Sequence, residues 1–219
     1  MPGDLHSHSN ASSDSTLSLK ARVQLAIDHD LSSIAITDHT AIHERLHDRE
    51  SVLNGVTVIA GVELNCIVDG DRIDILGLFV DPDILRKSVG SVTYGEGLTV
   101  ADGSDLSPED VIAIIHEAGG VAVLAHPGRY QVDLAELLHK LGDSGLDGIE
   151  TKYAYELAPV CGPYTPEARI ASLAAAFELV PAGGSDCHGP GYHDGPFMGA
   201  IRIPDSWIET LRSRSRQYQ

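Results

Sequence analysis

The sequence has few cysteines and no long apolar run. Its three cysteines, Cys66, Cys161 and Cys187, lie far apart and include no Cys-x-x-Cys pair. Neither a disulfide framework nor a thiolate zinc site is therefore indicated. No apolar run approaches the roughly 18 residues that a membrane-spanning helix needs, and the first residues lack the apolar segment of a signal peptide. We expect a soluble, cytoplasmic protein with no membrane partner.

Positive charge is also scarce. The 15 lysines and arginines are outnumbered by 32 aspartates and glutamates, which gives a formal net charge of −17. Binding of long nucleic acids relies on basic stripes that neutralise phosphates, so we expect no such partner. Some of the acidic residues would instead be carboxylates that bind metal ions. No feature of the sequence indicates an oligomeric state.

What the sequence does contain is an alternation of short apolar strands and amphipathic helices. The predicted strands cover residues 4–9, 32–36, 56–64, 71–80, 121–126, 146–151, 179–186 and 199–203. The predicted helices cover residues 18–31, 107–118, 133–141, 165–177 and 205–216. Residues 81–106 are rich in Gly, Ser and Asp and show no clear period, so they are predicted to form a long loop.

Seven or eight strands that alternate with helices indicate a parallel sheet in an α/β protein. A chain of 219 residues suits one domain, in which a closed or nearly closed barrel is more economical than an open sheet. The alternative architecture is a doubly wound open sheet. No Gly-x-Gly-x-x-Gly follows the first strand to support the dinucleotide site that is typical of that fold.

Candidate metal ligands follow the ends of these strands. His6 and His8 are two residues apart in "DLHSHS" (4–9), so on an extended strand both imidazoles point to the same face. An isolated pair of this kind is as consistent with a polar strand end as with a metal site. Further candidates follow other strands: Asp38, His39, Glu63, His126, Asp186 and His188. In a barrel the C-terminal ends of the strands converge on one face, where active sites lie.

These motifs together resemble those of the polymerase and histidinol phosphatase (PHP) superfamily, in particular its small stand-alone phosphoesterases. They follow the family's order: "DLHSHSNASSD" (4–14), "AITDHT" (35–40), "GVELN" (61–65), "AGGVAVLAHPGRY" (118–130) and "GGSDCHG" (183–189). The resemblance implies one PHP domain over residues 1–219, folded as a distorted (β/α)7-type barrel with a metal site at the C-terminal ends of its strands. It also implies two or three divalent ions of manganese, iron or zinc.

The resemblance further implies ligands, motif by motif. One ion would be held by His6, His8, Glu63 and Asp186. A second would share Glu63 and take His126, and a third would take Asp14, His39 and His188. Asp38 would support these ligands or bind weakly.

The chain departs from the family pattern at two places. Asp74 stands where most relatives carry a histidine before "ILG", and an oxygen ligand is chemically acceptable there. Residues 81–106 would take the place of the helical insertion that covers the site in relatives.

The chemistry implied is hydrolysis of a phosphoester by attack of a metal-activated hydroxide, with Glu63 and Asp186 at the reacting centre. Four more side chains are candidates for contact with the substrate: Arg129, Lys152 and Tyr153 for binding, and His193 together with Arg129 for catalysis. Positive groups would clamp the phosphate, a histidine would protonate the leaving group, and a tyrosine would stack on a base. Ordinary surface or core positions remain open for all four.

Three functions are compatible with the sequence. The first is a metal-dependent phosphoesterase whose partner is a small phosphorylated substrate, a phosphomonoester or a nucleotide. The second is an exonuclease that acts on short oligonucleotides. The third is a metal-binding structural or regulatory PHP module without activity, for which Asp74 is the only support, since the ligand positions are otherwise nearly complete.

Overall fold

The computed structural model describes residues 2–88, 92–94, 97–99, 106–155, 164–189 and 197–218. Its strands are β1 (Gly3–Asp4), β2 (Ser33–Ile36), β3 (Ala41–Ile42), β4 (Glu50–Leu53), β5 (Val56–Val68), β6 (Asp71–Leu78), β7 (Val92–Tyr94), β8 (Gly97–Thr99), β9 (Val121–Leu124), β10 (Gly148–Tyr153) and β11 (Val180–Gly184). Its helices are α1 (Leu19–Asp28), α2 (Pro82–Ser88), α3 (Pro108–Glu117), α4 (Leu134–Asp143), α5 (Glu167–Ala176) and α6 (Asp205–Ser215), with short 3-10 helices at Pro127–Arg129 and Arg216–Tyr218.

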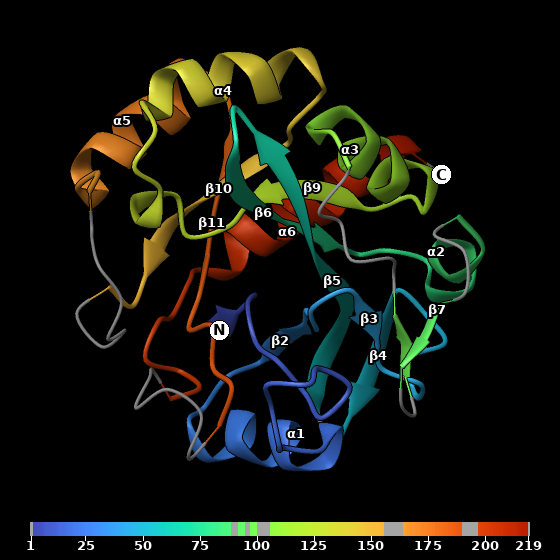
Figure 1. Ribbon diagram of the computed structural model, residues 1–219. Coiled ribbons are helices and arrows are strands. Elements are labelled where there is room, and N and C mark those ends of the chain that lie inside the picture. The colour runs from blue at the N-terminus through green and yellow to red at the C-terminus, as the bar shows by residue number, and fades with distance from the viewer. Residues whose placement is uncertain are drawn as a thin grey trace.

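Seven strands form a barrel that is nearly closed, with helices around the outside (Figure 1). The hydrogen-bonded order is β1-β2-β5-β6-β9-β10-β11, and β4 pairs with β5 beside this path. The two ends of the path meet where the Leu5 amide donates to the Gly183 carbonyl at 3.1 Å, and Ser7 forms a parallel bridge with Cys187. The prediction of a distorted (β/α)7-type barrel is confirmed.

Side chains alternate between the barrel interior and the surrounding helices, as the pleat of a strand requires. Ile59 of β5 belongs to an inner apolar cluster with Leu76 of β6 and Val123 of β9. Val58 and Val62 of β5 belong instead to an outer cluster that also contains apolar side chains of α1, α3 and α4. Odd-numbered positions of β5, among them 63 and 65, therefore face the interior.

The helices begin where the sequence supplies caps. Ser107 accepts a hydrogen bond from the Asp110 amide, and the Asp110 carboxylate accepts from the Ser107 amide, so the two form a capping box at the start of α3. The Asp133 carboxylate caps α4 by accepting hydrogen bonds from the amides of Ala135 and Glu136. Within the described part of the chain, no helix is long and apolar enough to cross a membrane.

The sheet differs from the expected parallel one in that β6 runs antiparallel to both of its neighbours, β5 and β9. The antiparallel direction of β6 is caused by the short turn at Asp69 and Gly70, whose φ angles are 54° and 93°. A tight two-residue turn with positive φ at both positions joins antiparallel strands only, whereas parallel strands need a long crossover. This hairpin is the main distortion of the barrel.

Two further expectations differ from the structure. The strand expected at residues 199–203 is reduced to one bridge between Gly3 and Ile203. The long loop expected over 81–106 contains helix α2, and strands β7 and β8 form a small antiparallel sheet with β3. Residues 89–91, 95–96 and 100–105 lie outside the described residues, so the prediction for them is not assessed.

Candidate metal centre

The predicted metal ligands gather at one end of the barrel. They form three groups in which the potential ligand atoms lie within 4.8 Å of one another. The groups consist of His6, His8, Glu63 and Asp186; of Glu63, Asp74 and His126; and of His8, Asp14, His39 and His188. The structure thus brings together all nine side chains expected at the site, and places Asp74 among them.

The first group is built by the chain segments that follow β1 and β11. His6 Nε2 lies 3.2 Å and His8 Nε2 lies 3.0 Å from the same oxygen, Oδ1 of Asp186. Both imidazoles have no solvent exposure, and Asp186 is 9% exposed. Their segments are held in register by a hydrogen bond of 2.8 Å from the Asp186 amide to the His6 carbonyl. Two nitrogens and a carboxylate therefore converge on one small volume.

Glu63 lies between all three groups. Its Oε2 is 3.3 Å from His6 Nε2 and 3.1 Å from His39 Nδ1, while its Oε1 is 3.1 Å from His126 Nε2. The side chain projects inward from β5 and is only 2% exposed. Each oxygen can serve a different ion, which is the geometry expected of a bridging carboxylate.

The third group centres on Asp14. Its Oδ2 is 3.2 Å from His39 Nε2 and 3.2 Å from His188 Nε2, and its Oδ1 is buried without a hydrogen-bond partner. The His188 ring stacks on His8 with centroids 4.0 Å apart. His188 Nδ1 lies 2.9 Å from the Asp186 carbonyl, a contact that favours a proton on Nδ1 and leaves the Nε2 lone pair for a metal.

Asp74 joins the second group from β6. Its Oδ2 is 3.8 Å from His126 Nε2, and its Oδ1 accepts a hydrogen bond of 3.1 Å from Arg72. His126 adopts a left-handed backbone conformation with φ of 30°, which is rare outside glycine and occurs here beside the site. Two carboxylates and one imidazole make this the most oxygen-rich of the three groups.

The electrostatics of the centre suit divalent cations. Burial lowers the pKa of His8 to about 3, so its imidazole is neutral and able to bind a metal at neutral pH. Burial alone would raise the pKa of Asp186, but His6 and His8 reverse this and hold it well below its usual range. The donors are imidazole nitrogens and carboxylate oxygens, the set that zinc, iron and manganese accept in proteins. The residues present therefore fit such ions.

Asp38 is not part of any of the three groups. Its carboxylate accepts hydrogen bonds from the Ser9 amide and, at 2.6 Å, from the Ser9 hydroxyl. Burial raises the pKa of Asp38 to about 6, and the Ser9 contacts oppose this rise. Asp38 thus fixes the backbone between His8 and Asp14, in agreement with a supporting role.

Two buried residues behind the ligands were missed in the sequence. Glu150 Oε2 lies 3.2 Å from His6 Nδ1 and accepts a hydrogen bond of 2.8 Å from the His126 amide. The Tyr130 hydroxyl lies 3.2 Å from His126 Nδ1 and accepts from the Asp74 amide. The available signal for Glu150 was a carboxylate beside Ile149 in the predicted strand "LDGIET".

A β-bulge explains how β10 contributes two residues to the interior. Glu150 and Tyr153 are three positions apart, so on a regular strand they would point to opposite faces. The pairing with β11 shifts between Glu150 and Lys152, leaving Thr151 outside the register. Both Glu150 and Tyr153 can then face the centre, and the Tyr153 hydroxyl donates to Asp186 Oδ2 at 2.7 Å.

The four predicted substrate contacts have different outcomes. Arg129 lies at the centre, 3.2 Å from the Tyr153 hydroxyl and 3.5 Å from Asp186 Oδ2. Tyr153 also lies there, but it is 3% exposed and its hydroxyl is engaged by Asp186. His193 lies outside the described residues.

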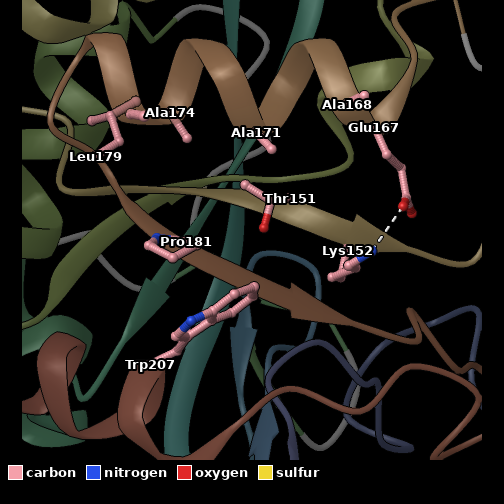
Figure 2. A pocket seen from close by; sticks show the side chains of 10 residues that line it. Thr151, Lys152, Glu167, Ala168, Ala171, Ala174, Leu179, Pro181 and Trp207 are labelled. Atoms are coloured by element: carbon pink, nitrogen blue, oxygen red, sulfur yellow. Dashed lines mark hydrogen bonds and ion pairs between the residues drawn. The ribbon is translucent and has the colours of Figure 1, made fainter.

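Lys152 is not brought to the centre. It pairs with Glu167 at 3.0 Å and lines a cavity between β10, β11, α5 and α6, on the helical side of the barrel (Figure 2). The bulge places Lys152 beside Thr151 on this outer face. The interpretation of Lys152 as a phosphate-binding residue is therefore not supported by its position.

Comparisons with known proteins extend these observations. A family model of the PHP domain matches residues 4–155. The chain is 40% identical over 105 residues to a phosphoribosyl 1,2-cyclic phosphate 1,2-diphosphodiesterase from Eggerthella lenta, covering 48% of this chain and only 37% of that protein. It is 26% identical to the 5'-3' exoribonuclease Rnm of Escherichia coli K12, in an alignment that covers 85% of each chain.

Solved structures show the same fold. A protein described as a metal-dependent phosphoesterase from Bifidobacterium adolescentis superposes with a TM-score of 0.74 and 21% identity, covering 97% of this chain and 96% of that one.

The exoribonuclease relatives correct our expectation about partners. We expected a small phosphorylated substrate and no long nucleic acid, but a relative that matches 85% of the chain is named for action on RNA. The error lies in using the net charge of −17 for the whole chain. Four of the 32 acidic residues, Asp14, Glu63, Asp74 and Asp186, are in the metal centre, where each divalent ion would add two positive charges.

Proposed function

The chain belongs to the PHP domain family, and we propose that it is a metal-dependent phosphoesterase that hydrolyses a terminal phosphoester of a nucleotide, free or at the end of a strand. The observation that carries the proposal is the position of Glu63, whose two oxygens contact histidines of all three potential metal groups. The names of the relatives, a cyclic phosphate diesterase and an exoribonuclease, support a phosphodiester or strand-end substrate.

Each part of the centre has a separate task in this proposal. Divalent ions bound by the three groups would neutralise phosphate oxygens and lower the pKa of a water molecule. Glu63 and Asp186 hold the imidazoles of His6 and His8 in a fixed arrangement, so little reorganisation is needed during the reaction.

Arg129 is the residue we assign to the phosphate. Its side chain is 29% exposed, so it reaches both solvent and the buried Asp186. Burial alone would lower the pKa of the Arg129 guanidinium, but the Tyr153 hydroxyl and the Asp186 carboxylate together raise it, so the guanidinium stays charged. A planar guanidinium in this position can bind two phosphate oxygens at once.

A hydrolysis screen tests the proposal: release of inorganic phosphate is measured for phosphomonoesters, and products are separated by chromatography for cyclic phosphates and oligonucleotides, because cleavage of a diester frees no phosphate. Protein would be assayed separately with Mn²⁺, Mg²⁺ and Zn²⁺ against nucleoside mono- and bisphosphates, ribose cyclic phosphates, and short and longer oligonucleotides with 5'-phosphates. We expect turnover of at least one nucleotide substrate, and nearly complete loss in Glu63→Gln, which removes the bridging charge at constant volume. Glu167→Gln, on the outer face of the barrel, is the matched control. No turnover on any substrate, or full activity in a folded Glu63→Gln protein, would refute the proposal.

A further inference from the structure

Asn65 is a buried polar residue that has no role in the centre described above. It stands two positions after Glu63 on β5, so by the pleat of the strand both side chains face the barrel interior. Asn65 is 6% exposed, and its Oδ1 is buried without a hydrogen-bond partner. A buried amide oxygen without a partner costs folding free energy unless a hydrogen-bond donor or a cation contacts it.

The neighbours of Asn65 indicate what that partner is. In the pairing of β5 with β6, Asn65 lies directly opposite Asp74. Residues opposite each other in an antiparallel pair have Cβ atoms about 4.5–5.5 Å apart on the same face. Glu63, Asp74 and Asn65 therefore present acceptor oxygens to the same region of the interior. Ionised carboxylates cannot donate to the Asn65 oxygen, whereas a cation can be shared by all three side chains.

We propose that Asn65 Oδ1 is a ligand of the ion held by Glu63, Asp74 and His126. The inference rests on the proposed metal-dependent function and assigns a fourth ligand to this group. Three oxygens and one imidazole nitrogen form a hard ligand set, which suits Mn²⁺ or Mg²⁺ better than a histidine-rich set does. Because of Asn65 and Asp74, the site for this ion would prefer different metals from the sites for the other two ions.

Calorimetric titration of the metal-free full chain with Mn²⁺ tests the assignment without requiring turnover. The variant Asn65→Leu keeps the branched shape and the number of heavy atoms but removes the oxygen, and Asn65→Asp replaces it with another oxygen ligand. Asn54→Gly is the control, since Asn54 lies in the turn before β5 with φ of 51°, a conformation that glycine adopts without strain. If circular dichroism shows that Asn65→Leu does not fold, Asn65→Ala gives the same comparison.

We expect one of the bound ions to lose affinity at least tenfold in Asn65→Leu, while the others are unchanged. Asn65→Asp should bind that ion as tightly as the wild-type chain or more tightly, and Asn54→Gly should be indistinguishable from wild type. If Asn65→Leu binds every ion with wild-type affinity, the assignment is overturned. If its KM is raised at the same time, Asn65 contacts the substrate instead of a metal ion. Equal weakening in Asn65→Leu and Asn65→Asp would also overturn it. Failure of the proposed function is seen separately, as wild-type chain that binds ions but has no turnover.

Discussion

Replacement of Glu150 by glutamine isolates the contribution of a residue that touches no proposed ion. Glu150 has no solvent exposure, and its Oε2 contacts both His6 Nδ1 at 3.2 Å and the His126 amide at 2.8 Å. A carboxylate at this position favours the proton on His6 Nδ1, which leaves the Nε2 lone pair directed at Glu63 and Asp186. Glutamine keeps the shape and the acceptor oxygen but removes the charge.

The expected magnitude follows from these two contacts. A hydrogen bond to a charged group contributes about 1.5–3 kcal/mol, and one between neutral groups about 0.5–1.5 kcal/mol. Losing the charge thus costs about 1–1.5 kcal/mol at each contact, and about 1.4 kcal/mol corresponds to tenfold in affinity. Glu150→Gln should weaken metal binding by roughly 10–100-fold, the range typical of residues that orient metal ligands.

Competition with a chelating dye, followed by Mn²⁺ titration, measures this effect. Glu167→Gln is the matched control, because Glu167 is paired with Lys152 on the outer face and should not influence the centre. Equal metal affinity in Glu150→Gln and the wild-type chain would refute the reasoning. A loss of the same size in Glu167→Gln would show that the effect is not specific to the buried position.

Three other predictions follow from single side chains. Asp74→His should shift the metal preference from Mn²⁺ towards Zn²⁺ with some turnover retained, measured by activity with each metal; an unchanged preference would remove Asp74 from the ligands. Arg129→Ala should lower kcat/KM roughly 10²-fold without changing metal content, so unchanged kinetics on the best substrate would make Arg129 a surface charge. Leu138→Ala, on α4, truncates a fully buried side chain and should cost about 2–5 kcal/mol in urea unfolding. A cost below about 1 kcal/mol would mean that this part of the outer cluster is loosely packed.

Several ligand positions were predictable because they lie within or just after expected apolar strands. His6 follows β1, Asp186 follows β11 and Glu63 lies within β5, and the barrel rule brings these parts of the strands together. The sequence also contained the signal for the β5–β6 hairpin, since Asp69 and Gly70 favour a tight turn. The expectation of a parallel sheet did not take into account that such a turn makes β6 antiparallel to β5.

Other features depend on three-dimensional contacts that no local pattern reports. The bulge in β10 sends Lys152 outward and Tyr153 inward, and it depends on pairing with β11, not on a motif in β10. Glu150 was missed because a single carboxylate in a strand usually faces solvent. The family resemblance placed Asp74 at a ligand position, and the pairing of β6 with β5 is what brings it beside Glu63.

The central claim is that three groups of side chains, joined by Glu63, bind divalent ions. Crystals of the chain grown with Mn²⁺ would test it most directly, by locating the ions from their anomalous scattering. The account predicts an anomalous peak within each of the three groups, with carboxylate oxygens of Glu63 bound to more than one ion. The absence of peaks from these groups, when Mn²⁺ is present at saturating concentration, would contradict it.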